Sequence, residues 1–232
     1  MEYEIKYRPS YSMLVVKLNQ GETITAEAGA MTYMTPNIQM KTRARAGVLD
    51  SIKLGVLGGQ SLFVNDYTAV GGPGEIALVS APLGDIERLT LDGRKGYIIQ
   101  RSAYIASDPA IELDIKWQGF TKGIFGQGLF MIKTSGRGDL FINTFGAIDK
   151  HELSAGESLI VDNFHLVAFS DTCSYEVRRM GGLKELALSG EGLVVEVRGP
   201  GEVLIQTKSI SEFANWLWQL LEPKVRAVMG AR

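Results

Sequence analysis

Residues 190–207 read Gly190-Glu-Gly-Leu-Val-Val-Glu-Val-Arg-Gly-Pro-Gly-Glu-Val-Leu-Ile-Gln-Thr207 and predict two short strands joined by a tight turn. The first strand, Leu193 to Arg198, mixes apolar and charged residues. The second, Val203 to Thr207, is apolar with a polar end. Pro200 fixes its own φ, and the glycines on either side turn the chain without steric cost. The stretch therefore favours a β protein whose strands are punctuated by glycine.

The same design occurs twice earlier in the chain. Gly126-Gln-Gly-Leu-Phe-Met-Ile is followed by Gly136-Arg-Gly-Asp-Leu-Phe-Ile-Asn143, and Gly59-Gln-Ser-Leu-Phe-Val-Asn is followed by Gly72-Pro-Gly-Glu-Ile-Ala-Leu-Val79. The glycines that open the three phrases are Gly59, Gly126 and Gly190, a spacing of about 65 residues. This spacing indicates a triplicated β unit.

A second shared phrase, made of a strand, a polar turn and another strand, marks the start of each unit. It runs over Val15 to Ile24, Leu89 to Ile99, and Leu153 to Val161. The predicted units are about 14–84, 85–151 and 152–208. Each unit has too few strands for a core of its own, so we expect them to pack as a single compact domain over residues 1–208.

Residues 209–232 are predicted to form a C-terminal helix and tail. Ser209 and Glu212 fit a capping box, in which both side chains satisfy free N–H groups of the first turn. Apolar residues follow at helical spacing: Phe213, Trp216, Leu217, Leu220 and Leu221. Pro223 is expected to end the helix. We interpret the helix as a cover for an edge or open end of the β assembly, with a partner-docking helix as the alternative.

Composition restricts the partners and the compartment. The 232 residues carry a formal net charge of −2, so we expect no nucleic-acid partner. The start, Met1-Glu-Tyr-Glu-Ile-Lys, has no basic segment followed by an apolar core, so no secretory signal is expected. Cys173 is the only cysteine, which excludes an internal disulfide and favours a cytoplasmic location.

The sequence offers no recognised catalytic, metal-binding or phosphate-binding motif. Two histidines and one cysteine fall in no ligand pattern, and no nucleophile elbow is present. We therefore expect no catalytic residues, no metal and no cofactor, in a protein that is not an enzyme. His165 is interpreted as a hydrogen-bonded structural residue on a strand, and Cys173 as a small core residue. The densest basic patch, Lys41-Thr-Arg-Ala-Arg45, is expected on a solvated loop.

Five phrases occur in an order typical of a known family. They are Glu27-Ala-Gly-Ala-Met-Thr-Tyr-Met34, Gly59-Gln-Ser-Leu-Phe-Val-Asn65, Gln100-Arg-Ser-Ala-Tyr-Ile-Ala-Ser-Asp108, Gly190-Glu-Gly-Leu-Val194, and Gly199-Pro-Gly-Glu-Val203 with Gln206-Thr207. Over nearly its whole length the chain resembles the family of the altered-inheritance-of-mitochondria protein twenty-four, whose prokaryotic members were formerly a domain of unknown function.

The resemblance implies a fold like that of the tryptophan RNA-binding attenuation protein. The predicted fold class is all-β, with three similar β units around a pseudo-threefold axis and a C-terminal helix. The units are expected in a β-sandwich or double-stranded β-helix-like arrangement. The mitochondrial members are associated with inner-membrane organisation, but this chain shows no transit peptide. The resemblance supplies no catalytic residues.

Two sets of residues are candidate sites. Glu27 and Arg101 fit a buried ion pair between units, and together with His165 they are a candidate polar cluster for a ligand. The second set is an apolar, lysine-bearing interaction patch, predicted to emerge on one face: Ile52, Lys53, Leu54, Leu57, Lys122, Ile124 and Phe125. The alternative is that the patch segments fold inward as connecting turns.

We therefore expect a non-enzymatic scaffold or interaction protein. It is expected to form a homo-oligomer, with a trimer favoured, because the edges of so many strands must be paired, covered or charged. It is expected to dock on protein or membrane partners. The expected location is the cytoplasm, with peripheral membrane contact. The alternative function is a small-molecule binding module with a pocket between β units. A third possibility is an enzyme whose site forms no linear motif.

Overall fold

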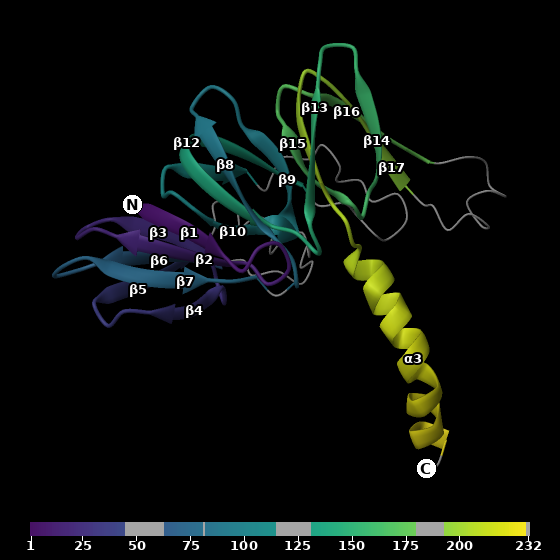
Figure 1. Cartoon of the computed structure of the whole chain (residues 1–232), viewed down its shortest axis with the longest axis horizontal. Helices are drawn as coiled ribbons and strands as arrows, with labels where there is room; N and C mark the ends of the chain where they lie inside the picture. The colour runs from purple at the N-terminus through teal and green to yellow at the C-terminus, as the bar shows by residue number, and fades with distance from the viewer. Residues whose placement is uncertain (45–62, 81, 115–130, 180–192, 231–232) are drawn as a thin grey trace.

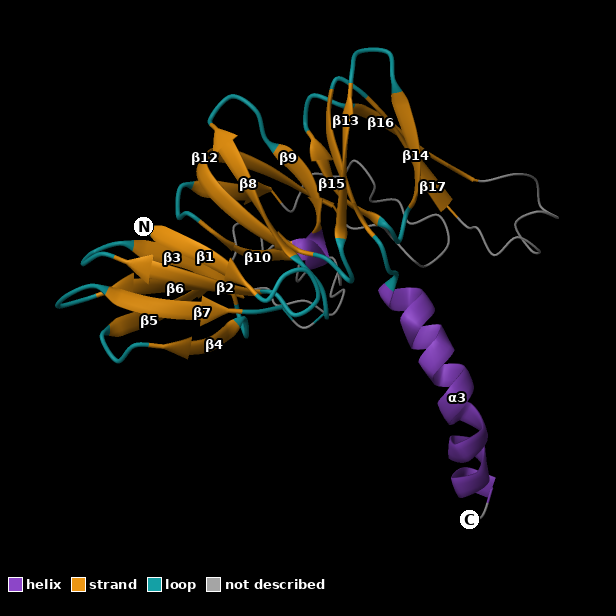
Figure 2. Cartoon of the chain, viewed as in Figure 1, coloured by secondary structure: helices purple, strands orange, loops and turns teal. Residues whose placement is uncertain are grey.

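Strands make up most of the regular structure of this chain (Figures 1 and 2). The computed structural model describes residues 1–44, 63–80, 82–114, 131–179 and 193–230. The only helices within these ranges are a short 3-10 helix and a long helix at the C-terminal end. The all-β fold class with a C-terminal helix is therefore confirmed.

The strands fall into three consecutive stretches. The first holds β1 (Glu2–Lys6), β2 (Met13–Leu18), β3 (Thr23–Glu27), β4 (Met31–Met34), β5 (Ile38–Ala44), β6 (Phe63–Ala69) and β7 (Gly74–Leu78). The second holds β8 (Ile86–Asp92), β9 (Tyr97–Gln100), the 3-10 helix η1 (Arg101–Ala103), β10 (Tyr104–Ser107), β11 (Ile111–Asp114) and β12 (Met131–Asn143). The third holds β13 (Ile148–Leu153), β14 (Ser158–Asp162), β15 (Leu166–Ser170), β16 (Ser174–Arg179), β17 (Leu193–Arg198) and β18 (Gly201–Gln206), and α3 (Ile210–Gly230) follows.

The same antiparallel pairings recur in each stretch. In one layer of the first stretch, β7 lies between β2 and β4. The second half of β12 lies in the same way between β8 and β10, and β18 lies between β13 and β15. In the other layer of the first stretch, β6 lies between β3 and β5. The first half of β12 lies in the same way between β9 and β11, and β17 lies between β14 and β16. Each stretch is thus a small two-layered sandwich.

Neighbouring stretches are joined through their sheets. β3 of the first stretch pairs with β10 of the second, and β9 of the second pairs with β15 of the third. The result is a long central sheet with a four-stranded sheet at one end (β1-β2-β7-β4) and a three-stranded sheet at the other (β14-β17-β16). Figure 1 shows the three stretches as a fan. A pseudo-threefold axis and the limits of the three units stay predictions.

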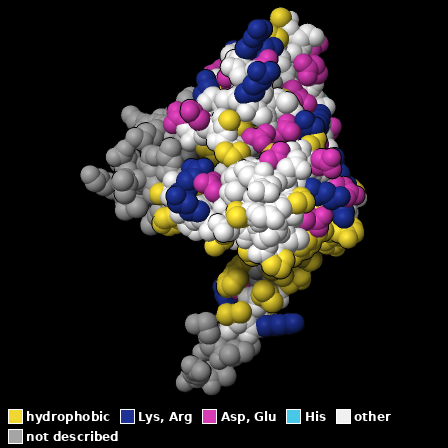
Figure 3. All heavy atoms as spheres, turned by 90° about the vertical axis from the view of Figure 1, so that its left-hand side faces the viewer, with side chains coloured by type: hydrophobic (Ala, Val, Ile, Leu, Met, Phe, Trp, Pro, Cys, Tyr) yellow, Lys and Arg dark blue, Asp and Glu magenta, His cyan; other side chains and the backbone are white. Residues whose placement is uncertain are grey.

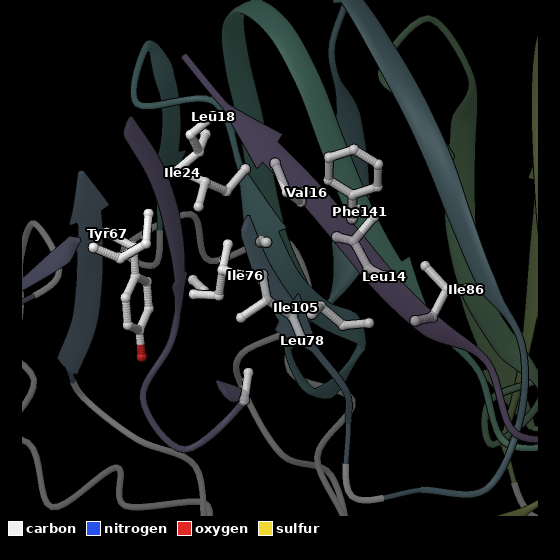
Figure 4. Close-up of a cluster of buried hydrophobic side chains, with 14 of the residues drawn as sticks. Leu14, Val16, Leu18, Ile24, Tyr67, Ile76, Leu78, Ile86, Ile105 and Phe141 are labelled. Carbon is white, nitrogen blue, oxygen red and sulfur yellow. The ribbon is translucent and has the colours of Figure 1, made fainter. Parts of the chain in front are cut away.

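Three apolar clusters fill the space between the layers, and each takes residues from more than one stretch. The first gathers around Leu14 and Ile76 and includes Phe141 from the second stretch (Figure 4). The second includes Val64 from the first stretch, and the third includes Ile98 from the second. Alternating apolar residues on the strands supply these inward faces. Because the clusters interlock, no stretch buries its core alone.

A buried carboxylate fastens the N-terminal segment to β8. The Asp85 side chain is almost fully buried and accepts hydrogen bonds from Arg8 Nε at 2.8 Å and from Ser12 Oγ at 2.8 Å. Arg8 also contacts Glu87, whose other oxygen lies 3.0 Å from Lys150 Nζ on β13. This chain of polar contacts links the first strand of each of the second and third stretches to the N-terminal segment.

Three sequence expectations are corrected by the strand pairing. The turn at Gly199 and Pro200 does not close a hairpin, because β17 and β18 pair with other strands in opposite layers. The described part of the phrase that begins at Gly126 forms one continuous strand, β12 (Met131–Asn143), which passes from one layer to the other. Lys41 to Ala44 lie on strand β5 rather than on a loop, and Arg43 Nε contacts Asp66 Oδ2 at 2.7 Å.

The passage of β12 between layers depends on glycine. Gly136 has a φ of +104°, a backbone conformation that residues other than glycine rarely adopt. A Cβ atom at this position would lie 2.2 Å from the carbonyl oxygen of Ala110. Gly136 therefore lets β12 bend while β11 packs closely against it.

Candidate functional site

The predicted interaction patch cannot be placed on the fold. Ile52, Lys53, Leu54, Leu57, Lys122, Ile124 and Phe125 all lie outside the described residues. The flanking strands are paired: Ala44 of β5 lies opposite Phe63 of β6, and β11 pairs with β12. The chain therefore leaves and re-enters the described fold at the ends of antiparallel pairs, and the patch stays a prediction.

Glu27, Arg101 and His165 occupy corresponding places in the three stretches. Glu27 ends β3, Arg101 follows β9 directly, and His165 lies in the turn after β14. All three side chains are half-buried. His165 is in a turn rather than on the strand expected from the sequence. A shared ligand site at these residues stays a prediction.

The His165 ring is held by the backbone. Its Nδ1 lies 2.7 Å from the carbonyl oxygen of Gln206. A carbonyl oxygen only accepts, so Nδ1 carries a proton and donates this hydrogen bond. The Gln206 N–H donates in turn to the carbonyl oxygen of His165 at 2.9 Å. This pair of contacts fixes the turn after β14 to the end of β18.

The end of β18 also fixes the start of the C-terminal helix. The buried Gln206 side chain accepts from the Phe145 N–H at 2.9 Å and donates to the carbonyl oxygen of Phe164 at 2.7 Å. The Lys208 N–H donates to the Phe145 carbonyl oxygen at 3.2 Å. The ring of Phe213, in the first turn of α3, lies 5.5 Å from the ring of Phe145. The turn between β12 and β13 is thus the seat of the helix.

The helix begins as the sequence indicates. The Oγ of Ser209 accepts a hydrogen bond from the backbone N–H of Glu212 at 3.2 Å, and Ser209 is almost fully buried. The predicted Ser209 cap is therefore confirmed.

The predicted end at Pro223 is wrong, because α3 continues through Pro223 to Gly230. A proline within a helix removes a single backbone hydrogen bond and crowds the preceding turn, which weakens the helix without compelling it to end. Beyond the proline, Arg226 Nη2 lies 2.6 Å from Glu222 Oε1 and supports the second half.

Beyond its first turn, α3 projects away from the strands (Figures 1 and 2). The prediction that the helix covers an edge or open end of the β assembly is therefore wrong. Trp216 is 55% exposed and Trp218 is 53% exposed, far above the values of side chains in a core. Large apolar side chains are exposed along the whole described part of the helix: Ile210, Phe213, Trp216, Leu217, Trp218, Leu220, Leu221 and Val225. Figure 3 shows hydrophobic side chains gathered where the helix leaves the body.

These apolar residues share one broad face of α3. With about 3.6 residues per turn, they span about 200° of the helix, from Trp216 at one border to Trp218 at the other. The remaining sector carries the polar side chains Ser211, Glu212, Asn215, Gln219, Glu222 and Arg226. A face this wide is broader than the narrow seam of a two-stranded coiled coil. The apolar face of α3 is the candidate functional site.

Sequence reasoning identified part of this face and missed the rest. Phe213, Trp216 and Leu217 follow the helical period, but Trp218 lies at the border and Val225 lies beyond the proline. An unbroken apolar period across Pro223 was the signal that could have placed Val225 on the same face.

Other chemistries have little support in the described part of the chain. No group of three or more His, Cys, Asp or Glu side chains there is arranged to hold a metal ion. Cys173 is buried in the third apolar cluster, as predicted, and burial raises the pKa of its thiol. None of the described helices is long and apolar enough to cross a membrane.

Comparisons with known proteins agree on one relationship. The family model described as Mitochondrial biogenesis AIM24 matches residues 3–208, which leaves α3 outside the match. An uncharacterised protein of Streptococcus pyogenes serotype M6 is 29% identical over 229 residues, which cover 95% of this chain and 91% of the relative. A crystal structure of a Streptococcus pyogenes protein superposes with a TM-score of 0.77 at 29% identity, covering 95% of this chain and 99% of the other.

Proposed function

This chain belongs to the Mitochondrial biogenesis AIM24 family, and from that premise we propose that it is a non-enzymatic scaffold that self-associates and docks on a membrane surface through α3. The observation that carries the proposal is the broad apolar face of α3, which the described strands leave exposed beyond the first turn of the helix. Apolar surface of this extent on a single projecting helix marks an interaction site.

A lipid surface fits the α3 face better than a single partner helix does. The two tryptophans, Trp216 and Trp218, lie at the two borders of the face, where a helix lying in a bilayer meets the headgroups. The wide apolar sector between them suits shallow insertion into the acyl boundary. Lys224 lies within this sector near the C-terminal end, where its long side chain can reach the headgroups.

The charges of α3 determine how this docking depends on salt. Glu222 and Arg226 contact each other on the polar face, and Glu212 and Lys224 are also of opposite sign. Because the charges nearly balance, burial of apolar surface provides most of the binding free energy. We therefore expect binding to weaken little between low and physiological salt.

Self-association supplements a weak membrane contact. One exposed helix contributes a modest affinity, and several helices on one assembly raise the effective affinity by avidity. A trimer is the stoichiometry we favour, since unpaired strand edges remain in the described fold and favour association. The non-enzymatic part of the proposal rests on the lack of a catalytic motif in the sequence and on the raised pKa of the buried Cys173 thiol.

A pair of neighbouring substitutions tests the docking surface. Leu220→Glu places a charge on the apolar face, and Gln219→Glu places the same charge on the polar face one residue away. Binding to vesicles of phosphatidylcholine and phosphatidylglycerol is followed by tryptophan fluorescence, to which Trp216 and Trp218 contribute two of the three tryptophans of the chain. We expect Leu220→Glu to weaken binding at least about tenfold and Gln219→Glu to change it less than about threefold.

Both variants should retain the melting temperature of the unmodified protein, because these side chains lie on a projecting helix. Equal vesicle binding by all three proteins would contradict membrane docking and would assign the α3 face to a protein partner.

A further inference from the structure

Two junctions inside the chain share one geometry. In the first, Thr25 and Ala26 of β3 lie opposite Ser107 and Ala106 of β10. In the second, Ile98 and Ile99 of β9 lie opposite Phe169 and Ala168 of β15. If β1, which has no counterpart among the described strands of the other two stretches, is left out of the count, the second strand of one sandwich (β3 or β9) pairs antiparallel with the third strand of the next (β10 or β15).

The second junction also exchanges side chains between neighbouring cores. Ile98 belongs to the second stretch, yet it packs in the third apolar cluster with Phe169. Ala168 belongs to the third stretch, yet it packs in the second cluster with Ile99. This junction therefore combines backbone pairing with burial of apolar residues on both sides. In the first junction, Ala106 of the second stretch packs in the first cluster beside Ala26.

A third junction of this kind would need the edges of β14 and β4. In the third stretch, β14 takes the place of β3 and β9, and among the described strands it pairs with β17 alone. In the first stretch, β4 takes the place of β10 and β15, and within the part of the chain that the structure describes it pairs with β7 alone. A register shift in each of β4, β10 and β15 supports their equivalence. The shifts lie at Met31/Tyr33, Tyr104/Ala106 and Leu166/Ala168.

The exposure of these two edges contrasts with that of their buried counterparts. Every residue of β10 is buried, as are the first four residues of β15, whereas three of the four residues of β4 are exposed. Tyr33 is 41% exposed, but Ala106 and Ala168 at the equivalent position are 0% exposed. On the edge of β14, Ile160 is 46% exposed, whereas the equivalent residues of β3 and β9, Thr25 and Ile98, are 4% and 5% exposed. Both unpaired edges thus display apolar residues at positions that the internal junctions bury.

We propose that β14 of one copy of this chain pairs antiparallel with β4 of a second copy. By equivalence with the internal junctions, Ile160 would lie opposite Met34 and Val161 opposite Tyr33 of the second copy. Ile160 then packs beside Met34 at the margin of the first apolar cluster, and Tyr33 packs beside Val161 in the third. The four-stranded and three-stranded end sheets become one continuous sheet across the contact.

The residues along the two edges permit this contact. β4 reads Met31-Thr-Tyr-Met34 and holds neither the lysine nor the proline with which exposed edges are commonly protected. β14 carries one charge, at Asp162, and no charge on β4 opposes it. No electrostatic repulsion therefore disfavours the pairing.

The second strand must come from another copy. β4 and β14 lie in the end sheets of the fan, which the intervening paired strands hold apart (Figure 1). Because the two edges differ, the contact is head-to-tail, and the two end copies of an open assembly each keep one edge free until a ring closes. This inference rests on the self-association in the proposed function and specifies the strands that perform it.

Blocking one edge at a time tests the pairing. Ile160→Lys blocks β14, Tyr33→Lys blocks β4, and Met31→Lys is a second block of β4. Val70→Lys, in the turn between β6 and β7, is a control with 42% exposure in the unmodified protein. Sedimentation velocity measures assembly, and circular dichroism with thermal melting confirms that each variant is folded.

We expect the unmodified protein and Val70→Lys to assemble, and each edge variant alone to sediment as a monomer. An equimolar mixture of Ile160→Lys and Tyr33→Lys should form a 1:1 dimer and nothing larger, because one intact β14 and one intact β4 remain. Folded edge variants that assemble like the unmodified protein, or monomeric variants that form no dimer on mixing, would overturn the pairing. A monomeric unmodified protein would instead contradict self-association itself.

Discussion

Replacing Asp85 by asparagine should lower the free energy of unfolding by about 2–3 kcal/mol. The substitution keeps the shape of the side chain and removes its charge from a buried position that accepts hydrogen bonds from Arg8, Ser12 and the N–H of Ile86. Hydrogen bonds to charged groups contribute about 1.5–3 kcal/mol each, but the Arg8 side chain is 43% exposed, so solvent screens its share.

The pH dependence of this effect has a definite sign. Burial alone would raise the pKa of Asp85, but the hydrogen bonds from Arg8, Ser12 and the N–H of Ile86 outweigh burial and hold its pKa below the ordinary value. A carboxylate with a depressed folded pKa stabilises the protein above its unfolded pKa of about 3.9 and loses that contribution as the pH falls. The difference between the unmodified protein and Asp85→Asn should therefore be full at pH 7 and shrink below about pH 4.

Urea denaturation at several pH values measures this difference directly. At pH 7 the melting temperature should also fall by about 4–10 °C. Asp149→Asn is the matched control, because the Asp149 side chain is 58% exposed and its contact is with His151. A loss below about 0.5 kcal/mol for Asp85→Asn, or a difference that widens on acidification, would mean that the charge of Asp85 does not stabilise the fold.

Gly136→Ala should destabilise the protein by about 2–4 kcal/mol in urea denaturation, because it combines a positive φ with a Cβ placed 2.2 Å from the Ala110 carbonyl oxygen. Gly156→Ala, at φ +90° with nothing within 4 Å of the added Cβ, should cost only about 1 kcal/mol, and equal losses would show that the close approach has no effect. Because burial raises the pKa of the Cys173 thiol, a disulfide reagent at pH 8 should react with it at least about tenfold more slowly in the folded protein than in urea. Equal rates would mean that the thiol is accessible.

Most of the strands could be predicted from local sequence. Turns rich in glycine, next to short apolar runs, indicated β2 and β3, β8 and β9, and β13 and β14, and the structure confirms strands at these places. Strands β1 and β5 were missed, because Glu2 to Lys6 and Lys41 to Ala44 are rich in charge and are ordered through pairing with neighbours. Tertiary pairing therefore overrode weak local propensity.

The assignment of strands to layers could not be predicted. The turn at Gly199 and Pro200 is compatible with a hairpin and with a passage between layers, and burial of Val195 and Val203 across the sandwich decides for the passage. The pairing of strands between stretches could not be predicted from the sequence either. Ala26 and Ala106 lie opposite each other at one junction, but small apolar residues do not indicate which strand they will pair with.

The amphipathic character of α3 was predictable, but its direction was not. Periodic spacing of Phe213 and Trp216 is compatible with a helix that lies on the strands or leaves them. The direction follows from non-local contacts at the seat, where Lys208 bonds to Phe145 and the Phe145 ring meets Phe213. The polar cluster at Glu27, Arg101 and His165 was proposed from residue type alone, and its role stays a prediction.

Hydrogen–deuterium exchange at high and low protein concentration tests the head-to-tail assembly most directly. Amides of β4 and β14 should gain protection together as the protein concentration rises, while amides of β10 and β15, already paired on both edges, should exchange at one rate throughout. Unchanged exchange in β4 and β14 across a concentration range in which the protein associates would contradict the head-to-tail assembly.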